Sequence, residues 1–360
     1  MTPAPPPATP DWLAPQPLAQ ACALPARCYT DPHAGERDRV AVLARGWQLA
    51  ARESELACPG DHTLAEVAGV PLVLVRDREG VLRALHNVCR HRAGPLAACA
   101  GSGLERLSCR YHGWTYALDG RLLGAPGMAR VPGFDPREIC LPQARLACWQ
   151  GLVFVCLDAA APAFAEVVEG IDARLGGVSL AAMRPERRVV YRVDCDWKLY
   201  VDNYLEGYHV RCVHPGLSGL LDAQAYATTL SRWHSLQASP LDGADALYGS
   251  GEALYWFIYP NTMINLLPGR LQTNRVLPDG PGRCTVVFDY AYLPGQADPQ
   301  RVAADLAFSD TVQAEDAAIC AAVQRGMASG SWPPGRLNPA QEQGVWHFHE
   351  LLRAAWRSAP

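Results

Sequence analysis

The chain has 360 residues, of which 49% are hydrophobic and 19% charged, and its formal net charge is -4. This composition is typical of a globular protein with room for two domains, and it excludes a wholly disordered chain. The absence of a basic block argues against a nucleic-acid or anionic-membrane partner, and no apolar run reaches the roughly 18 residues that span a bilayer, so we expect a soluble, cytoplasmic protein.

The first half of the chain predicts a leader followed by a β domain. Residues 1 to about 25 are rich in Pro and Ala and are expected to be loosely ordered, and "RDRVAVLARGWQLA" from residue 38 has helical spacing. Short runs rich in Val and Leu then alternate with turn signals as far as "GLVFVCL" at 151–157, and Asp119-Gly120 marks a hairpin. We therefore expect a leader at 1–37, a β domain at 38–158 and a second domain at 159–360.

The second half predicts an α+β domain. Residues 253–293 have the pattern of an antiparallel meander, and residues 301–325 that of a long helix. In the last strand of the meander, alternate residues share one face, namely Val286, Phe288, Tyr290 and Tyr292.

Cysteine usage favours reduced thiols. The chain has 13 cysteines, an odd number, and most of them lie singly among apolar residues. A secreted disulfide framework would be expected in a short chain with an even count. We expect free thiols in the core, with a few recruited as ligands.

Two short motifs combine cysteine with histidine. Cys89 and His91 form Cys-x-His, and after the 17 residues 92–108, Cys109 and His112 form Cys-x-x-His. Such a set is compatible with a zinc ion bound by two cysteines and two histidines, or with a 2Fe-2S cluster that has both cysteines on one iron and both histidines on the other. Zinc fingers usually pair like with like, whereas each motif here supplies one residue of each kind, which favours the cluster.

These motifs carry a family resemblance. The stretches "CRHRAGPL" and "CRYHGWTYALDGRL" closely resemble the Rieske domain of Rieske-type non-heme iron oxygenases, specifically their catalytic α subunits, and the resemblance extends from about residue 45 to 352. It implies an all-β Rieske 2Fe-2S domain followed by an antiparallel-sheet catalytic domain of the helix-grip (START-like) fold. It also implies Cys89, His91, Cys109 and His112 as the cluster ligands.

A second group of metal-binding residue types lies in "DNYLEGYHVRCVHP" at 202–215. On a helix, Glu206 and His209 would share a face, whereas His214 would be rotated from His209 by roughly 140°. Both imidazoles can therefore reach one metal only if the helix bends or ends between them. Pro215 favours such an end.

A carboxylate in the predicted long helix can complete this group. Val312, Asp316, Ile319 and Val323 are spaced as an apolar helix stripe, so Asp316 would be buried and would require a cation. With His209 and His214 it would form the two-histidine, one-carboxylate triad that leaves open positions on Fe(II). The resemblance assigns the same three residues, and Glu315 is the alternative ligand if the register is off by one.

The resemblance also implies a role for Glu206 and an assembly. Glu206 would bridge His209 to a Rieske histidine of a neighbouring subunit, in a trimer or a hexamer of trimers. The alternative is a solvated helix carboxylate. No G-x-G-x-x-G or other nicotinamide or flavin motif is present, so electrons from NAD(P)H would come through a separate flavin/iron-sulfur reductase.

Three stretches in the second half are most similar to the branch that contains choline monooxygenase and the glycine betaine and carnitine oxygenases. They are "ALYWFIYPNTMINLLPG", "EDAAICAAVQRG" and "GRLNPAQEQGVWHFHELL". They predict N-demethylation or hydroxylation of a quaternary ammonium compound, with Trp256, Tyr204 and Tyr208 as cage residues. Tyr255 and Phe257 are further candidates, although they point away from the face of Trp256 in a strand.

Two other functions remain open. One is hydroxylation or O-demethylation of an aromatic compound, and the other is a Rieske electron carrier without oxygenase activity. His86, His347 and His349 are expected to be structural.

Overall fold

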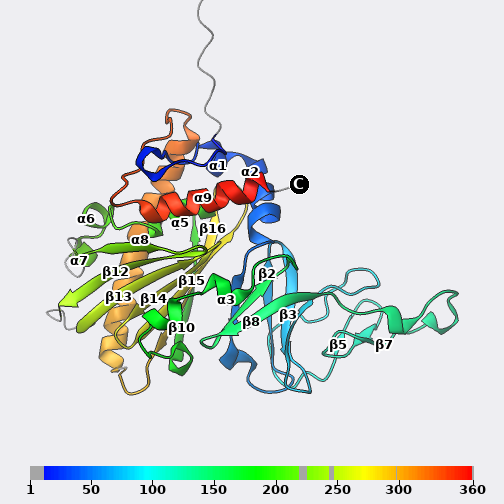
Figure 1. Ribbon diagram of the computed structural model, residues 1–360. Helices are drawn as coiled ribbons and strands as arrows, with labels where there is room; N and C mark the ends of the chain where they lie inside the picture. The colour runs from blue at the N-terminus through cyan, green and yellow to red at the C-terminus, as the bar shows by residue number, and fades with distance from the viewer. Residues whose placement is uncertain (1–11, 219–224, 243–246, 297, 359–360) are drawn as a thin grey trace, which may run out of the picture.

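The structure, a computed structural model, describes residues 12–218, 225–242, 247–296 and 298–358. A large antiparallel sheet organises each half of the chain (Figure 1). The α+β character expected from the sequence is confirmed. Among the described residues, no helix is long and apolar enough to cross a membrane.

The first half forms a six-stranded sheet in the order β1-β9-β8-β4-β3-β2 and a three-stranded sheet in the order β5-β6-β7. Short helical turns η3 to η5 connect some of these strands. The bounds are β1 Gln48–Arg52, η3 Glu53–Leu56, β2 His62–Val67, β3 Val70–Arg76, β4 Leu82–His86, β5 Leu107–Ser108, β6 Thr115–Tyr116, β7 Leu122–Gly124, η4 Met128–Arg130, η5 Pro136–Glu138, β8 Gln143–Trp149 and β9 Leu152–Cys156.

The predicted hairpin at Asp119-Gly120 joins β6 to β7. These strands pair antiparallel, and Gly120 has a φ of 95°, a conformation that glycine adopts at no steric cost. The small sheet extends away from the rest of the molecule (Figure 1).

Two expectations for the N-terminal region are only partly right. Residues 39–43 form a short π-helical turn, η2 Arg39–Leu43, that continues a helix ending at Asp38, but residues 48–52 form strand β1. All five residues of β1 are buried, and a strand that is buried on both faces has no alternating pattern to distinguish it from a helix.

The leader is also more ordered than expected. From residue 12 onward it contains η1 Leu18–Gln20, α1 Arg27–Thr30 and α2 Pro32–Asp38, and Leu24 and Cys28 have no exposed surface. Residue Cys22 bridges to Arg336, so the leader packs against the second half. Residues 1–11 lie outside the described part of the chain.

The second half forms a seven-stranded sheet in the order β10-β16-β15-β14-β13-β12-β11. The bounds are α3 Phe164–Val167, α4 Ile171–Arg174, η6 Leu180–Ala182, β10 Arg184–Val193, α5 Trp197–Tyr204, α6 Val210–Val213, α7 Pro215–Ser218, β11 Ala227–Leu230, β12 His234–Asp242, β13 Ser250–Ile258, β14 Thr262–Leu267, β15 Arg270–Pro278, β16 Cys284–Tyr292, α8 Pro299–Ala328 and α9 Gln343–Arg357.

The predicted meander and long helix are confirmed as β13 to β16 and α8. The four alternate residues of β16 all belong to one hydrophobic core. Strands β10 to β12 were not predicted, because β10 is an edge strand whose side chains are mostly exposed or half-buried and carry many charges.

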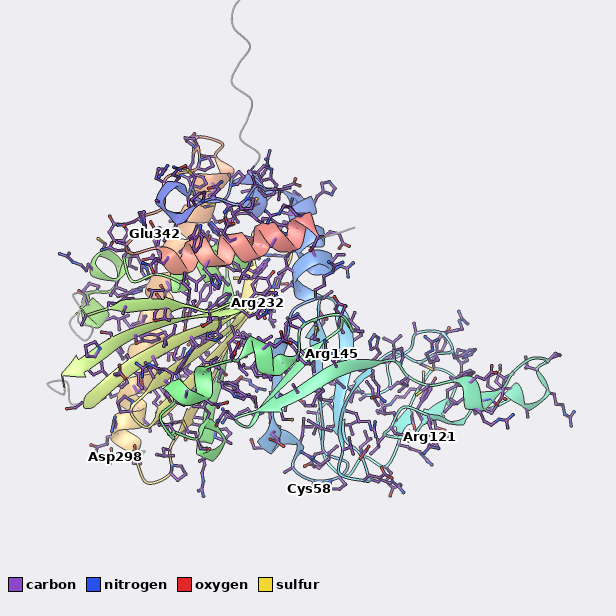
Figure 2. All side chains as sticks on the ribbon, in the orientation of Figure 1. Cys58, Arg121, Arg145, Arg232, Asp298 and Glu342 are labelled. Carbon is purple, nitrogen blue, oxygen red and sulfur yellow. The ribbon has the colours of Figure 1, made fainter. Side chains whose placement is uncertain are left out.

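The two halves pack against each other. The Trp47 indole donates to the carbonyl of Pro162 at 3.0 Å. The guanidinium of Arg145, which is labelled in Figure 2, lies 4.9 Å from the Trp47 ring. Leu49 and Phe154 of the first sheet share a core with Trp256 of the second. The first sheet is therefore held against the second.

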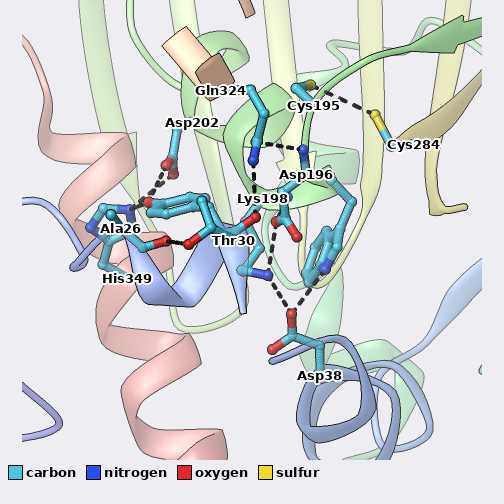
Figure 3. A network of polar contacts seen from close by, with 12 residues as sticks. Ala26, Thr30, Asp38, Cys195, Asp196, Lys198, Asp202, Cys284, Gln324 and His349 are labelled. Atoms are coloured by element: carbon cyan, nitrogen blue, oxygen red, sulfur yellow. Dashed lines mark hydrogen bonds and ion pairs between the residues drawn. The ribbon is translucent and has the colours of Figure 1, made fainter. Parts of the chain in front are cut away.

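A buried ionic network fixes the start of α5 (Figure 3). The Lys198 side chain has no exposed surface; its ammonium lies 2.8 Å from Asp196 and also donates to Asp38 of α2. Asp38 further accepts from the indoles of Trp197 and Trp356. Four contacts among five side chains of α2, α9 and the start of α5 thus satisfy charges that would be costly to bury alone.

Candidate functional site

The two Cys/His motifs fold into matching turns beside the small sheet. The carbonyl of Cys89 accepts from the amide of Ala93 at 3.0 Å, and the carbonyl of Cys109 accepts from the amide of Gly113 at 3.0 Å. Ala93 and Gly113 both have positive φ, 56° and 73°. The sequence therefore forms the same tight turn twice, one for each pair of ligand types.

The four side chains suit a binuclear cluster. Cys89 and Cys109 are each 3% exposed, and the ring centroids of His91 and His112 lie 4.5 Å apart. The Nδ1 atom of His91 is buried without a hydrogen-bond partner, as expected of a nitrogen that awaits a metal. Within the described ranges, no three of these ligand atoms converge within 4.8 Å, which disfavours a single zinc ion and suits two irons.

Neighbouring side chains leave little freedom at this centre. A Cβ atom on Gly94 would lie 2.8 Å from the sulfur of Cys109, so only glycine fits there. The Tyr116 hydroxyl lies 3.2 Å from the Cys89 sulfur, and burial together with this contact raises the pKa of Tyr116. The hydroxyl thus stays protonated and can donate to a cluster-bound thiolate, a contact that tunes the reduction potential.

The second group converges on one point. The Nε2 atoms of His209 and His214 are 3.2 Å apart, and Oδ1 of Asp316 lies 3.0 Å from His214 Nε2 and 3.8 Å from His209 Nε2. These three are the group in the described chain whose ligand atoms all lie within 4.8 Å of one another. Two imidazoles and one carboxylate at this spacing fit a mononuclear Fe(II).

The two histidines come together because helix α5 ends before them and a separate short helix follows. Helix α5 ends at Tyr204, and the short α6 has His209 at its N-terminal end and His214 at its C-terminal end. An end of the helix before Pro215 was expected, but Glu206 and His209 do not share a helix face as assumed. Glu206 instead accepts from the amides of Tyr208 and His209 at the start of α6.

Carboxylates hold the outer nitrogens of both imidazoles. Glu206 Oε1 lies 2.7 Å from Nδ1 of His209, and Glu315 Oε2 lies 2.8 Å from Nδ1 of His214. Glu315 therefore lies on the outer side of the His214 ring, and Asp316 rather than Glu315 belongs to the convergent group. Asn203 donates to Asp316 at 2.6 Å. Burial would lower the pKa of His214, but its bonds to Asp316 and Glu315 raise it, so this acidic site favours a positive charge.

Helix α8 presents a stripe different from the one expected. Val323 is 39% exposed, and Val312 and Ile319 are only half-buried. The buried face is instead formed by a largely polar series that includes Asp305, Ser309, Gln313 and Gln324. Asp316 is correctly placed because it lies between Gln313 and Cys320 on that face. Apolar periodicity missed the others because they are buried by hydrogen bonding rather than by hydrophobicity.

A cavity of about 140 Å³ opens onto the three convergent ligands. Helices α5 and α8 and strands of the second sheet enclose it. Its aromatic lining is Tyr200, Tyr204, Tyr226, Tyr248, Tyr255, Phe288 and Phe308, and its amide lining is Asn203, Gln237, Asn265, Gln272, Asn274 and Gln313. One basic side chain, Arg270, also lines it.

Only part of the predicted aromatic cage lines this cavity. Tyr204 and Tyr255 do, but Trp256 and Phe257 are 1% exposed and belong to hydrophobic cores, and Tyr208 is 57% exposed on the surface. The expected contacts of Trp256 and Tyr208 with a substrate are not supported. Tyr255 occupies the wall because residues alternate along β13, and it points opposite to its neighbours.

Sequence reasoning missed several lining residues. Arg270, Gln272 and Asn274 are alternate residues of β15, a polar series on one face of that strand. That alternation was a usable signal for a cavity-facing edge. Tyr226, Tyr248 and Phe308 carry no comparable signal, because they reach the cavity from three separate segments.

The three histidines expected to be structural, His86, His347 and His349, lie outside both groups. The Nε2 atom of His349 lies 2.9 Å from Asp202 and 3.3 Å from the Tyr29 hydroxyl, and so ties α9 to α5 and α1 (Figure 3). His347 is on α9, and His86 ends β4.

Sequence comparisons match both halves of the chain. Residues 46–135 match the Rieske [2Fe-2S] domain, and residues 180–358 match the ring hydroxylating alpha subunit (catalytic domain). Choline monooxygenase from Arabidopsis thaliana chloroplasts is 37% identical over 93% of this chain and 83% of that protein. The carnitine monooxygenase oxygenase subunit of Escherichia coli K12 is 30% identical over 97% of this chain and 99% of that protein.

Solved structures give a consistent comparison. The quaternary ammonium Rieske monooxygenase CntA superimposes with a TM-score of 0.86 at 26% identity, over 95% of this chain and 99% of that one. Naphthalene 1,2-dioxygenase from Rhodococcus sp. gives a TM-score of 0.74 at 20% identity over 94% of this chain and 95% of that one, which shows a shared fold.

Proposed function

The chain belongs to the Rieske non-heme iron oxygenases, and from this premise we propose that two sets of its residues hold the two cofactors. Cys89, His91, Cys109 and His112 would bind the 2Fe-2S cluster, and His209, His214 and Asp316 the mononuclear Fe(II). The convergence of the second set within 4.8 Å is the observation that carries this assignment. When bound, the cofactors supply electron relay and reductive activation of dioxygen, and the enzyme is an oxidoreductase that incorporates oxygen.

The protein's own contribution is orientation and exclusion of water. Glu206 and Glu315 each hold one imidazole by its Nδ1 atom, which fixes the tautomer that leaves Nε2 free for metal. Asn203 restrains Asp316 in the same way. The aromatic walls of the cavity exclude water from the space in front of these three ligands.

We propose a quaternary ammonium compound as the substrate, oxidised at a carbon next to nitrogen by hydroxylation or N-demethylation. The support is a cavity lined by the rings of seven tyrosines and phenylalanines, whose metal end carries Glu206 and Asp316. Ring faces attract a trimethylammonium group by roughly 0.5 to 2 kcal/mol each, and the carboxylates add a favourable field. The similarity to choline and carnitine monooxygenases points the same way.

A turnover screen tests this function. Purified enzyme with a surrogate reductase is supplied with betaines, choline, carnitine and simple aromatic acids, and formaldehyde release and product mass are measured. We expect oxygenated or demethylated product from at least one quaternary ammonium compound. Turnover of aromatic acids alone would overturn the substrate assignment in favour of the aromatic alternative.

A non-catalytic electron carrier is not favoured. A carrier needs only the first set of ligands, and it would give no reason for His209, His214 and Asp316 to converge beside an apolar cavity. The similarity to naphthalene 1,2-dioxygenase bears on the fold and gives no support for an aromatic substrate.

We further propose partners and an assembly. Electrons would come from NAD(P)H through a separate flavin/iron-sulfur reductase, and the chain would form a homotrimer or a hexamer of trimers. The small sheet with the Cys/His motifs and helices α6 and α7 lie at opposite ends of the molecule (Figure 1), which supports electron transfer between subunits. The helix-grip description of the catalytic domain is supported by α8, a 30-residue helix packed along an antiparallel sheet.

A further inference from the structure

The far end of the cavity from the iron ligands contains a buried ion pair that the proposed function does not use. Arg270, at the start of β15, is 6% exposed, and its Nε donates to Asp305 of α8 at 2.7 Å. Its Nη2 donates to Gln272. Both Arg270 and Gln272 line the cavity.

Asp305 accepts hydrogen bonds from three neighbouring side chains. Besides Arg270, it accepts from the hydroxyls of Tyr248 at 2.6 Å and Tyr292 at 2.5 Å. The pair is therefore neutral overall, and it does not repel a cation held elsewhere in the cavity. Burial would lower the pKa of Arg270, but Asp305 raises it, so the guanidinium stays charged.

The guanidinium keeps donors for a further ligand. Besides the bonds to Asp305 and Gln272, the guanidinium contacts the Tyr292 hydroxyl. A guanidinium has five N–H groups in a planar fork that matches a carboxylate. Asp305, Gln272 and Tyr292 use at most three of these groups, so at least two remain for a ligand in the cavity that Arg270 lines.

The position of the Arg270 guanidinium along α8 determines how long a ligand must be to reach both Arg270 and the metal end of the cavity. Arg270 and Ser309 both bond to Gln272, so the guanidinium lies near the level of Ser309. Ser309 precedes Asp316 by seven residues, which is about 10 Å along a helix axis. A molecule whose methyl group lies at the metal end can therefore reach Arg270 only through a spacer of several bonds.

We propose that Arg270 binds the carboxylate of the substrate, so that the cavity selects quaternary ammonium carboxylates with an extended spacer over choline-like alcohols. The inference rests on the proposed function and narrows its substrate class. The ammonium end lies among aromatic rings near Glu206 and Asp316, and the carboxylate end lies at Arg270 and Gln272. One cavity thus matches both charges of a zwitterion.

Anaerobic calorimetry on the iron-loaded enzyme measures this preference without turnover. The matched ligands are γ-butyrobetaine and (4-hydroxybutyl)trimethylammonium, which differ only in the terminal carboxylate or alcohol. We expect wild-type enzyme to bind the carboxylate roughly 10- to 100-fold more tightly, as charged hydrogen bonds predict. Equal affinity, or tighter binding of the alcohol, would overturn the inference.

Variants separate recognition from a structural role. In Arg270→Gln/Asp305→Asn, which removes both charges together, the preference should fall below about threefold, while the alcohol binds as in wild type. Arg270→Lys, which retains the charge but loses the fork, should keep part of the preference. Arg283→Gln, an exposed arginine at the β15–β16 turn, is the control and should change nothing.

The outcomes separate the role of Arg270 in carboxylate binding from the proposed oxidation of a quaternary ammonium compound. A preference that survives in the double variant contradicts the role of Arg270 while the proposed function stands. If the double variant does not fold, the wild-type ligand pair and Arg270→Lys still decide. If wild-type enzyme binds neither ligand and turns over no quaternary ammonium compound, the role of Arg270 and the proposed function are both overturned.

Discussion

Glu206 contacts three groups at the iron site at once. One carboxylate oxygen holds Nδ1 of His209, and the other accepts from the amides of Tyr208 and His209. It is thus tied to His209, a proposed iron ligand, through the imidazole ring itself, at a position that is only partly buried. This geometry supports the proposed bridge to a neighbouring subunit.

Glu206→Gln should slow coupled oxygenation roughly 10- to 100-fold while both metals stay bound, because the amide retains an acceptor for the two backbone N–H groups but loses the charge. Iron content and single-turnover rate are measured on the same sample. Glu315→Gln is the matched control; it should weaken iron binding at His214 without slowing electron transfer in the fully loaded fraction. An unchanged rate in Glu206→Gln would refute the bridging role.

His347 on α9 should make stability depend on pH. Burial, and then the charge of His234, lower the pKa of His347 to about 4, while the carbonyls of Arg232 and Ser231 partly oppose them. Because the unfolded chain binds a proton near pH 6.5, the stabilisation is complete above that pH and is lost as pH falls toward 4, by up to about 3 kcal/mol.

Denaturant unfolding at pH 7 and pH 4.5 tests this dependence. His347→Gln should lose less stability between these two pH values than wild type does. His33→Gln, which changes an exposed histidine, should follow wild type. A variant at position 347 with the full wild-type pH dependence would contradict the assignment.

Short motifs at the residue scale were largely predictable from sequence. The ligand types at 89, 91, 109 and 112 are read from spacing alone, and their turns require only local hydrogen bonds. The cage was not predictable in the same way. Trp256 and Tyr255 are neighbours in sequence, and which of them faces the cavity depends on the register of β13 against β12 and β14.

At the element scale, α5 is held in place by the buried charges of Lys198, Asp38 and Asp196. Asp38→Ala should lower the free energy of unfolding by roughly 3 to 5 kcal/mol, because it leaves a buried ammonium with one partner instead of two. Chemical denaturation measures the change.

Glu36→Gln on the same helix is the control for Asp38→Ala. Glu36 pairs with Arg39 at the surface, and such an exposed pair adds little to stability. Equal effects of the two substitutions would show that the buried network does not stabilise the docking of α2 on α5.

Strands and helices whose apolar residues repeat with one regular spacing were predictable from the sequence. Those whose side chains are buried on both faces, or mostly exposed, were not. The strands β13 to β16 and the helix α8 follow clear patterns. The strand β1 is buried on both faces and β10 lies on an edge, so neither shows the alternation that identifies a strand. The buried stripe of α8 is polar, and its partners come from β15, β16 and α5, which no local pattern reveals.

At the scale of the whole molecule, the two candidate metal centres lie at opposite ends (Figure 1). Electron transfer falls steeply with distance, so a partner subunit is expected to supply the cluster that serves each iron. Mixed oligomers of Cys109→Ser and Asp316→Ala subunits should therefore regain activity that neither variant has alone.

Turnover of co-expressed, doubly tagged oligomers measures this complementation. A mixture of Asp316→Ala and His214→Ala subunits, which both lack the iron site, should stay inactive. Loss of activity in every mixture would contradict transfer between subunits. The assembly itself was not predictable from local patterns, because it depends on surfaces that meet only between chains.

The most direct test of two separate centres in one chain is a metal and sulfide count paired with spectroscopy. Reconstituted wild-type protein should contain about three irons and two sulfides per chain with a Rieske paramagnetic signal, and Asp316→Ala should lose about one iron while that signal stays unchanged. Two irons in both proteins, or a zinc ion in place of the cluster, would contradict the account.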